Sequence, residues 1–505
     1  MSTITLNNTI PIAVVGAGSM GAGIAQLAAQ SGHVVRLFDA NPGAADAGLK
    51  RIAADLDGAV KRAKMDAATR DATLARIAVA GAIDGLGGCG LVVEAIVEKL
   101  DVKQALFRQL EELVAPDAVL ATNTSSISIT AVAQGLKRPQ RLVGWHFFNP
   151  ATRMKLVEII PGVETDAALI PALHALSKAW GKTSVDAPNT PGFIVNRVAR
   201  HYYAEGLRLL AERLAPAPAI DKLMREAGGF AMGPFELMDL IGLDVNLSVT
   251  ESVFQATSFD TRYAPHVIQQ ELVRSGRYGR KSGRGFYPYG KDVAMPDVST
   301  VVPTASPPLL EVPPDAGLLA PLVQRLQAAG ARLTVNDGLA EETLAIGATR
   351  IALTDGRTAA QRGAGSALIL LDLARDWSTA TTLGATAAGG ASLGELAAVV
   401  DAAHIALIEL DDVAGLAVMR TVCCLANEGA DVMTWTGTRA ADIDIAMVLG
   451  TAYPMGPLAW ADALGAARVA QLLANLQAHY GDARYRRAPL LSRLQHTPQG
   501  RFHDR

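Results

Sequence analysis

Two residues, a histidine and a glutamate twelve positions apart, have the types that acid–base chemistry needs. His146 stands in the segment GWHFFNP and Glu158 in KLVEII. A neutral imidazole can take a hydroxyl proton near pH 7, and a carboxylate beside it selects one tautomer and stabilises the charged form. A strand, a turn and a second strand could bring the two together. On spacing alone, a histidine beside Trp145, Phe147 and Phe148 is more typical of a packed core.

A glycine-rich turn gives the second chemical signal. Gly16, Gly18 and Gly21 form a G-x-G-x-x-G between the apolar run PIAVV and a helical pattern, and Asp39 ends the next apolar run. This context is the dinucleotide-binding, or Rossmann, fingerprint. Gly16 permits the tight turn, Gly18 leaves room for a pyrophosphate, and Gly21 lets helix and strand approach. The alternative is a turn with only a structural task.

Cofactor contacts are expected on both sides of this turn. Ser19 and Met20 begin the helix, whose free N–H groups and dipole favour phosphates. Asp39 is expected to bind the hydroxyls of the adenosine ribose, unless it is a simple turn residue. A carboxylate there repels a 2′-phosphate, so the sequence predicts NAD rather than NADP.

The elements that must position these residues indicate an α/β domain followed by helices. Strand and helix patterns alternate over 1–188 and predict a doubly wound parallel sheet, whereas 189–290 is a predicted helical domain. The proline-rich stretch 291–315 predicts a linker. A small degenerate α/β segment is expected over 316–405, and a second helical domain over 406–505.

The second helical region repeats the first at a constant offset of 223 positions. The matched pairs are Gly192 and Gly415, Glu205 and Glu428, Asp221 and Asp444, and Pro234 and Pro457. This regularity predicts an internal duplication. Met419 stands where Asn196 stands in the first copy, and a thioether cannot donate a hydrogen bond as an amide does. We therefore expect one active site, in the first half.

Composition narrows the class of protein. The length of 505 residues predicts roughly three or four domains. A net charge of −3, with both signs interspersed, gives no footprint for nucleic acid. The three cysteines show no metal-type spacing, so no metal and a reducing compartment are expected. No basic leader and no membrane-length apolar run stand out, which predicts a cytoplasmic protein without membrane contact.

Several segments in this order resemble the 3-hydroxyacyl-CoA dehydrogenase family. They read GAGSMGAGIAQ, VVEAIVEKLDVKQALF, TNTSSISI, GWHFFNPATRMKLVEII, NTPGFIVNR and MGPFELMDLIGLD. The resemblance is dense over about 10–290, and the duplicated tail resembles long bacterial members associated with phenylacetate breakdown and 3-hydroxybutyryl-CoA. It implies NAD-dependent oxidation of (S)-3-hydroxyacyl-CoA to 3-ketoacyl-CoA, or the reverse, in fatty-acid or aromatic-acid catabolism.

The same resemblance assigns roles to individual residues. It implies that His146 is the catalytic base, that Glu158 orients it, and that Ser125 and Asn196 complete a polar cluster, Asn196 from the helical domain. Ser125 would also lie by the nicotinamide. Further cofactor contacts are implied at Glu98, Lys103, Asn149 and Lys281.

The coenzyme A end of the site matches less closely. The family binds the CoA phosphates near a basic helix with a serine and a lysine, and the aligned residues here are Asp55 and Arg62. Arg62 and the neighbouring Lys61 are therefore the candidate CoA contacts, whereas Asp55 departs from the pattern. A solvated basic helix face is the alternative.

Two other functions stay open, a dehydrogenase of non-thioester β-hydroxyacids with a catalytic lysine and a non-catalytic NAD-binding homologue. The segment HFFNP together with Glu158 argues against the first, and the joint presence of Ser125, His146, Glu158 and Asn196 argues against the second.

The duplication also predicts an assembly. In shorter family members, helical domains of two chains pack as a dimer, and the second copy here is expected to mimic that dimer within one chain. The apolar positions expected to face the first copy are Leu416, Met419, Val422 and Cys423. A homo-oligomer of whole chains is a further possibility.

Overall fold

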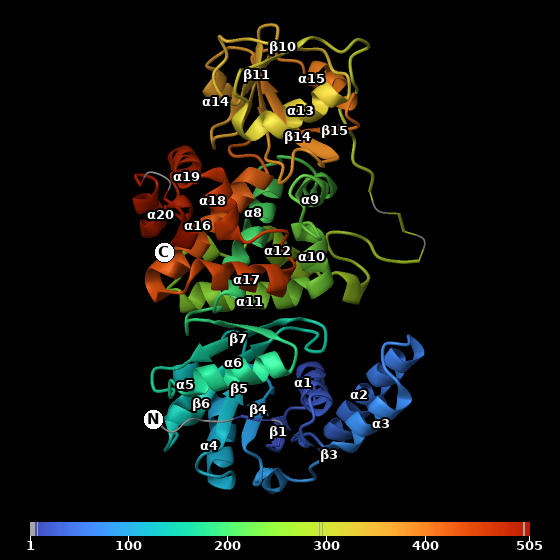
Figure 1. Ribbon diagram of the computed structural model, residues 1–505, viewed down its shortest axis with the longest axis vertical. Helices are drawn as coiled ribbons and strands as arrows, with labels where there is room; N and C mark the ends of the chain where they lie inside the picture. The colour runs from blue at the N-terminus through green and yellow to red at the C-terminus, as the bar shows by residue number, and fades with distance from the viewer. Residues whose placement is uncertain (1–5, 8, 292, 295, 498–499, 505) are drawn as a thin grey trace. The chain divides into compact units, whose positions relative to one another are not determined.

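The computed structural model describes residues 6–7, 9–291, 293–294, 296–497 and 500–504. The chain divides into two units (Figure 1). The first runs to Arg197 and includes Leu449–Thr451, and the second holds the remainder from Val198 onward. This division falls after Arg197, later than the boundary predicted after residue 188, so by its contacts Asn196 is grouped with the first unit.

An eight-stranded sheet forms the centre of the first unit, in the order β3-β2-β1-β4-β5-β6-β7-β8. All neighbouring strands are parallel except β6 and β7. The bounds are β1 Ile12–Val15, α1 Ser19–Gln30, β2 Val35–Phe38, α2 Ala44–Lys61, α3 Ala67–Ala75, β3 Ile77–Val79, β4 Leu91–Glu94, α4 Leu100–Leu113, β5 Val119–Thr122, α5 Ile129–Ala133, β6 Leu142–Phe147, β7 Leu156–Pro161, α6 Leu169–Ala179 and β8 Thr183–Asp186. The strand order reverses between β1 and β4, and ligands of such sheets bind in the crevice at that point.

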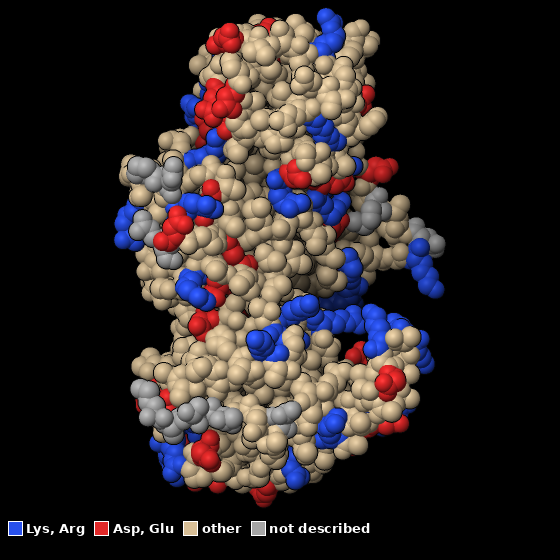
Figure 2. Space-filling view, in the orientation of Figure 1, with Lys and Arg blue, Asp and Glu red and all other residues tan. Residues whose placement is uncertain are grey.

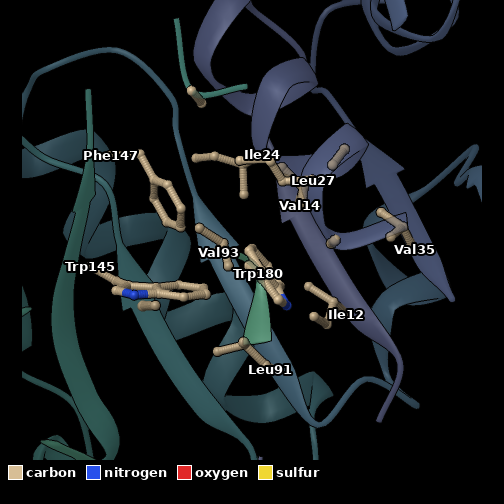
Figure 3. Packing of buried hydrophobic residues seen from close by; sticks show 14 of the residues in the cluster. Ile12, Val14, Ile24, Leu27, Val35, Leu91, Val93, Trp145, Phe147 and Trp180 are labelled. Atoms are coloured by element: carbon tan, nitrogen blue, oxygen red, sulfur yellow. The ribbon is translucent and has the colours of Figure 1, made fainter. Parts of the chain in front are cut away.

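Aromatic packing holds β6 and α6 together in this unit (Figure 3). The ring centroid of Trp145 lies 4.7 Å from that of Phe147 and 4.9 Å from that of Trp180. The indole N–H of Trp145 donates to Ser177 Oγ at 3.0 Å, so its one polar atom is satisfied inside the core. Each such buried side chain contributes roughly 1.5–3 kcal/mol to folding. Rigid packing on one side of β6 fixes the strand that carries His146.

Two groups of helices lie in the second unit. The first group comprises α8 Arg200–Ala211, α9 Ala217–Glu226, α10 Pro234–Ile241, α11 Leu243–Ala256 and α12 Val267–Arg274. The second comprises α16 Val418–Thr436, α17 Ala440–Thr451, α18 Pro457–Leu464, α19 Ala466–Tyr480 and α20 Pro489–Leu494, of which α17 ends in the first unit.

The two groups repeat one detail of hydrogen bonding. Asp221 accepts the backbone N–H groups of Phe235 and Glu236 at the start of α10, each at 3.0 Å. Asp444 accepts those of Leu458 and Ala459 at the start of α18, at 2.9 and 2.8 Å. Every member of the second set lies 223 positions after its counterpart, so the repeat extends from sequence to side-chain contacts.

A second sheet, of seven strands in the order β10-β9-β11-β12-β13-β14-β15, lies between the two helical groups in the chain. Its elements are β9 Leu310–Val312, α13 Ala320–Ala328, β10 Leu333–Val335, β11 Thr343–Ile346, β12 Thr349–Leu353, α14 Ala359–Gly363, β13 Leu368–Leu371, β14 Thr382–Ala388, α15 Leu393–Asp401 and β15 Ala406–Glu409. The predicted boundaries of this α/β segment were too narrow at both ends.

The predicted linker over 291–315 is wrong at its end, and the second helical domain does not begin at 406. β9 lies inside the predicted linker, and β15 begins at Ala406. Leu310 and Val312 are buried, but a three-residue strand flanked by prolines is too short to show a period of two. Only pairing with β10 and β11 identifies it as a strand.

Candidate functional site

His146 and Glu158 face each other across neighbouring strands. β6 and β7 are antiparallel, and their register sets these two residues opposite one another. His146 Nδ1 lies 2.8 Å from Glu158 Oε2, and both side chains are buried. His146 is buried, as a core histidine would be, but its imidazole ring contacts a carboxylate. With Nδ1 occupied by Glu158, only Nε2 is left for a ligand.

The second oxygen of Glu158 holds the segment that carries Asn196. Glu158 Oε1 accepts the backbone N–H groups of Ile194 and Val195 at 3.0 and 3.1 Å, where α7 (Val195–Val198) begins. Asn196 Nδ2 donates to the carbonyl oxygen of Ser125 at 3.4 Å. The four residues expected to form the polar cluster are thus brought together within the first unit.

Glu98 organises the loop of Ser125. Its Oε1 accepts from Thr124 Oγ1 at 2.6 Å and from the backbone N–H of Ser125 at 2.9 Å. Lys103 lies between two carboxylates, with Nζ 2.6 Å from Glu94 Oε1 and 3.2 Å from Glu98 Oε2. Burial raises the pKa of Glu98, but the charge of Lys103 and the donated hydrogen bonds outweigh burial and leave the pKa lowered. Lys103 is buried, so its ammonium supports Glu98 from within the protein.

The glycine-rich turn is shaped by close backbone contacts at two glycines and by open space at the third. Gly16 has φ +98°, and a Cβ there would lie 2.4 Å from Ala95 O. A Cβ on Gly21 would lie 1.7 Å from Gly16 O. A Cβ on Gly18 would meet nothing within 4 Å. Protein packing therefore requires Gly16 and Gly21, whereas Gly18 borders space that a ligand can fill.

Other predicted cofactor residues gather around this turn. Asp39 Oδ2 accepts the N–H of Ala17 at 2.8 Å. Ser19 begins α1, which no described side chain caps, and its hydroxyl lies 3.5 Å from Asn149 Oδ1. Met20 follows in the first turn of α1. Uncapped N–H groups at a helix start bind anions, so the turn has the donor set for a pyrophosphate.

Three predicted contacts lie away from these clusters. Lys281 belongs to the second unit, where its Nζ donates to Asp244 Oδ2 at 2.7 Å. Lys61 and Arg62 are exposed where α2 ends, and Figure 2 shows basic side chains gathered at the tip of the α2–α3 hairpin. Asp55 accepts from Gln26 Nε2 at 3.0 Å, which gives this residue a structural task in joining α1 and α2.

Three residues that support the site were missed in the sequence. Glu94 ends β4 and holds Lys103, and Thr124 donates to Glu98. Lys182 donates to the carbonyl oxygens of Ala151 and Met154 at 2.6 and 2.7 Å, and burial lowers its pKa to about 8. An acidic residue at the end of a buried parallel strand was the available signal for Glu94. No local pattern marks the other two.

Family models match most of the chain. The model described as 3-hydroxyacyl-CoA dehydrogenase, NAD binding domain, matches residues 11–190. The corresponding C-terminal domain model matches twice, at 192–289 and 415–501. The chain belongs to the 3-hydroxyacyl-CoA dehydrogenase family. The predicted family is thereby confirmed, and the activity is NAD-dependent oxidoreduction of 3-hydroxyacyl-CoA. A third model, 3-hydroxybutyryl-CoA dehydrogenase reduced Rossmann-fold domain, matches residues 351–413.

Named relatives support the same family. The chain is 40% identical over 486 residues to 3-hydroxyadipyl-CoA dehydrogenase of Escherichia coli K12, covering 96% of this chain and 97% of the relative. A 3-hydroxybutyryl-CoA dehydrogenase of Clostridioides difficile is 39% identical and covers 55% of this chain and 99% of its own. The crystal structure of 3-hydroxybutyryl-CoA dehydrogenase from E. coli K12 matches with a TM-score of 0.88 at 38% identity, covering 97% of this chain and 98% of that one. Among the described helices, none is both long and apolar enough to cross a bilayer.

Proposed function

We propose that His146 is the base that removes the 3-hydroxyl proton of a 3-hydroxyacyl-CoA, and that Glu158 is its partner. The buried His146–Glu158 contact of 2.8 Å carries this proposal. Glu158 holds the Nδ1–H tautomer, so Nε2 takes the proton, and the carboxylate then stabilises the imidazolium. Bound NAD supplies the hydride acceptor. Ser125 and Asn196 hold the substrate oxygen through hydrogen bonds, and Asn196 is kept in place by the bonds from α7 to Glu158.

The residues around the glycine-rich turn fit NAD. Open space at Gly18 suits the pyrophosphate, and the N–H groups of Ser19 and Met20 suit its charge. Asp39 suits the ribose hydroxyls. Glu98 is proposed to present the Ser125 loop to the nicotinamide end, with Lys103 supporting it through the ion pair. Asn149 is proposed as a contact beside Ser19, and Lys281 as a further cofactor contact.

Replacing Asp39 with serine should weaken NAD binding and relax the preference against NADP. Serine can still bind a ribose hydroxyl. Unlike a carboxylate, it has no negative charge to strengthen its hydrogen bonds to the ribose or to repel a 2′-phosphate. Initial rates with each dinucleotide at saturating substrate give the ratio. Wild-type protein that turned over NADP as well as NAD would contradict the role of Asp39.

The acyl group is proposed from the relatives. Their names include 3-hydroxyadipyl-CoA and 3-hydroxybutyryl-CoA dehydrogenase, so we propose a short or dicarboxylic 3-hydroxyacyl chain, in fatty-acid or phenylacetate catabolism. Lys61 and Arg62 are proposed to meet the CoA phosphates. A spectrophotometric series with both thioesters and the matching free hydroxy acids tests this function. Faster turnover of free acids would favour the non-thioester class, and NAD binding without turnover would favour a non-catalytic homologue.

We further propose that the second sheet and helices are a copy of the first that has lost the chemistry. Val185 pairs with Glu158, and Ile408, 223 positions later, pairs with Gly384. Gly384 therefore occupies the position of Glu158. The N–H of Asp372 donates to Gly384 O, so Asp372 occupies the position of His146.

Asp372 holds the start of the following helix, as Glu158 does in the first half. Its Oδ2 accepts the N–H groups of Ala417 and Val418 at 2.9 and 2.8 Å, at the positions 223 after Ile194 and Val195. Burial raises the pKa of Asp372 to about 6, although these donors oppose the shift. A carboxylate thus anchors the start of the following helix in each half, but in the second half the residue opposite it is Gly384 and not a histidine.

One NAD should bind to each chain. Calorimetric titration of the full chain is expected to give a stoichiometry of one, because the sequence of the second sheet contains no G-x-G-x-x-G and an aspartate replaces the base. Unchanged heats in Asp372→Asn would serve as the control. Two equivalents of NAD per chain would refute the single site.

The second copy is proposed to pack on the first as a dimer partner would. α16 packs against α8, and the four predicted apolar residues on or just before α16 are buried. Arg420 Nε lies 2.7 Å from Glu205 Oε2, and His201 Nε2 lies 3.0 Å from Glu428 Oε2. Glu205 and Glu428 are repeat counterparts, so each copy offers the same glutamate to a basic residue of the other. The basic partners Arg420 and His201 are not counterparts in the repeat, so these contacts support an approximate two-fold relation and not an exact one.

A further inference from the structure

The guanidinium of Arg51 lies against the glycine-rich turn. Arg51 is in α2, and its Nη2 donates to the carbonyl oxygen of Ala17. Gly48, one turn earlier, permits this approach, because a Cβ there would lie 3.0 Å from both the Cβ and the oxygen of Ala17. Helical side chains lean toward the N-terminus of their helix. Arg51 therefore reaches back past Gly48 to the turn.

Ala17 consequently lies between opposite charges. Its N–H donates to Asp39 Oδ2 at 2.8 Å, and its carbonyl oxygen accepts from Arg51. Asp39 follows β2, where the adenosine ribose of a dinucleotide binds in such folds. The Arg51 side chain is exposed, and a guanidinium has five N–H donors in a planar fork. One bond to Ala17 leaves donors that can bind a phosphate in bidentate fashion.

We propose that Arg51 is a specificity-determining residue for the dinucleotide, a phosphate-binding group beside the adenosine ribose whose attraction Asp39 opposes. The proposal rests on the proposed role of Asp39. The carboxylate repels a 2′-phosphate, whereas the guanidinium attracts it, and the preference for NAD is the balance of the two. Removing Asp39 should admit NADP because Arg51 is already in place. Removing Arg51 should sharpen the preference for NAD.

Titration of the full chain with NAD and with NADP tests this in four proteins: wild type, Asp39→Ser, Arg51→Gln and the double variant. Asp39→Ser should bind NADP at least tenfold more tightly than wild type does. Adding Arg51→Gln should remove about tenfold of that affinity, the usual worth of a charge-assisted hydrogen bond. NAD affinity should change by only a few fold on adding Arg51→Gln, which also shows that the double variant is folded.

Lys50→Gln provides the matched control, because Lys50 is the exposed neighbour on the same helix and loses the same charge. It should leave the NADP affinity of Asp39→Ser unchanged. Equal losses of NADP affinity from Lys50→Gln and Arg51→Gln would overturn the proposal. Such a result would mean that any positive charge on this helix attracts NADP, without a direct contact from Arg51. An Asp39→Ser protein that loses NAD affinity without gaining NADP would also overturn it, while leaving the role of Asp39 intact. Unchanged NAD and NADP affinity in Asp39→Ser would overturn both.

Discussion

Replacing His146 with alanine is expected to lower turnover of a 3-hydroxyacyl-CoA by roughly 10²–10⁴-fold, the usual contribution of a positioned acid–base group. The loss should appear in kcat, because the imidazole acts on the proton that leaves during hydride transfer. NAD affinity should stay close to that of wild type, since the glycine-rich turn and Asp39 do not contact His146. Stopped-flow turnover and calorimetric NAD titration measure the two quantities separately.

His174→Ala is the matched control for this variant. His174 lies in the same unit, with Nε2 2.7 Å from Asp186 Oδ1, but its side chain is partly exposed and that of Asp186 is exposed. It should keep normal turnover, so a general effect of removing a histidine–carboxylate pair is excluded. Near-normal turnover in His146→Ala would refute the proposed base.

The Glu158→Gln variant tests whether turnover depends on the negative charge of Glu158 as well as on the hydrogen bond that orients His146. The amide retains one acceptor oxygen, so either His146 or the start of α7 keeps its hydrogen bond, but not both with full strength. Turnover should fall because the imidazolium loses its counter-charge.

Arg420→Met is expected to lower the free energy of unfolding by roughly 3 kcal/mol, the lower end of the usual cost of removing one partner of a buried ion pair, because Glu205 keeps its ion pair with Arg208. The side chain of Arg420 is fully buried, and it bonds Glu205 at 2.7 Å and Glu212 at 2.9 Å. The hydroxyls of Tyr480 and Tyr485 also accept from it, at 2.9 and 2.6 Å. Urea unfolding of the full chain, followed by far-ultraviolet circular dichroism, measures the change.

The matched control applies the same substitution to an exposed pair. Arg274 forms an ion pair with Glu271 on α12, and both side chains are more than half exposed. Arg274→Met should cost less than about 1 kcal/mol, because water screens such pairs. Equal stability of Arg420→Met and wild type would refute the proposal that this contact joins the two copies.

Local sequence was sufficient for the parts of the protein whose contacts are close in the chain. The turn of Gly16, Gly18 and Gly21 follows directly from backbone sterics, and Asp39 from its place after the next strand. His146 and Glu158 lie on adjacent strands joined by one turn, so a spacing of twelve positions could suggest their contact. The resemblance to the family turned that suggestion into an expectation, and the constant offset of 223 revealed the repeat.

Only the tertiary structure decided which polar groups are buried together across long stretches of chain. Lys103 is buried between Glu94 and Glu98. Lysine is usually exposed, so the residue type alone does not predict this position. Arg420 meets a glutamate 215 positions away, and Asp372 meets backbone groups 45 to 47 positions away. Burial in a shared core selects these partners, because an uncompensated charge there is costly. Hydrophobic period and local spacing contain no information on such distant pairing, and the same reason hid the short strand β9, which exists only through its neighbours in the sheet.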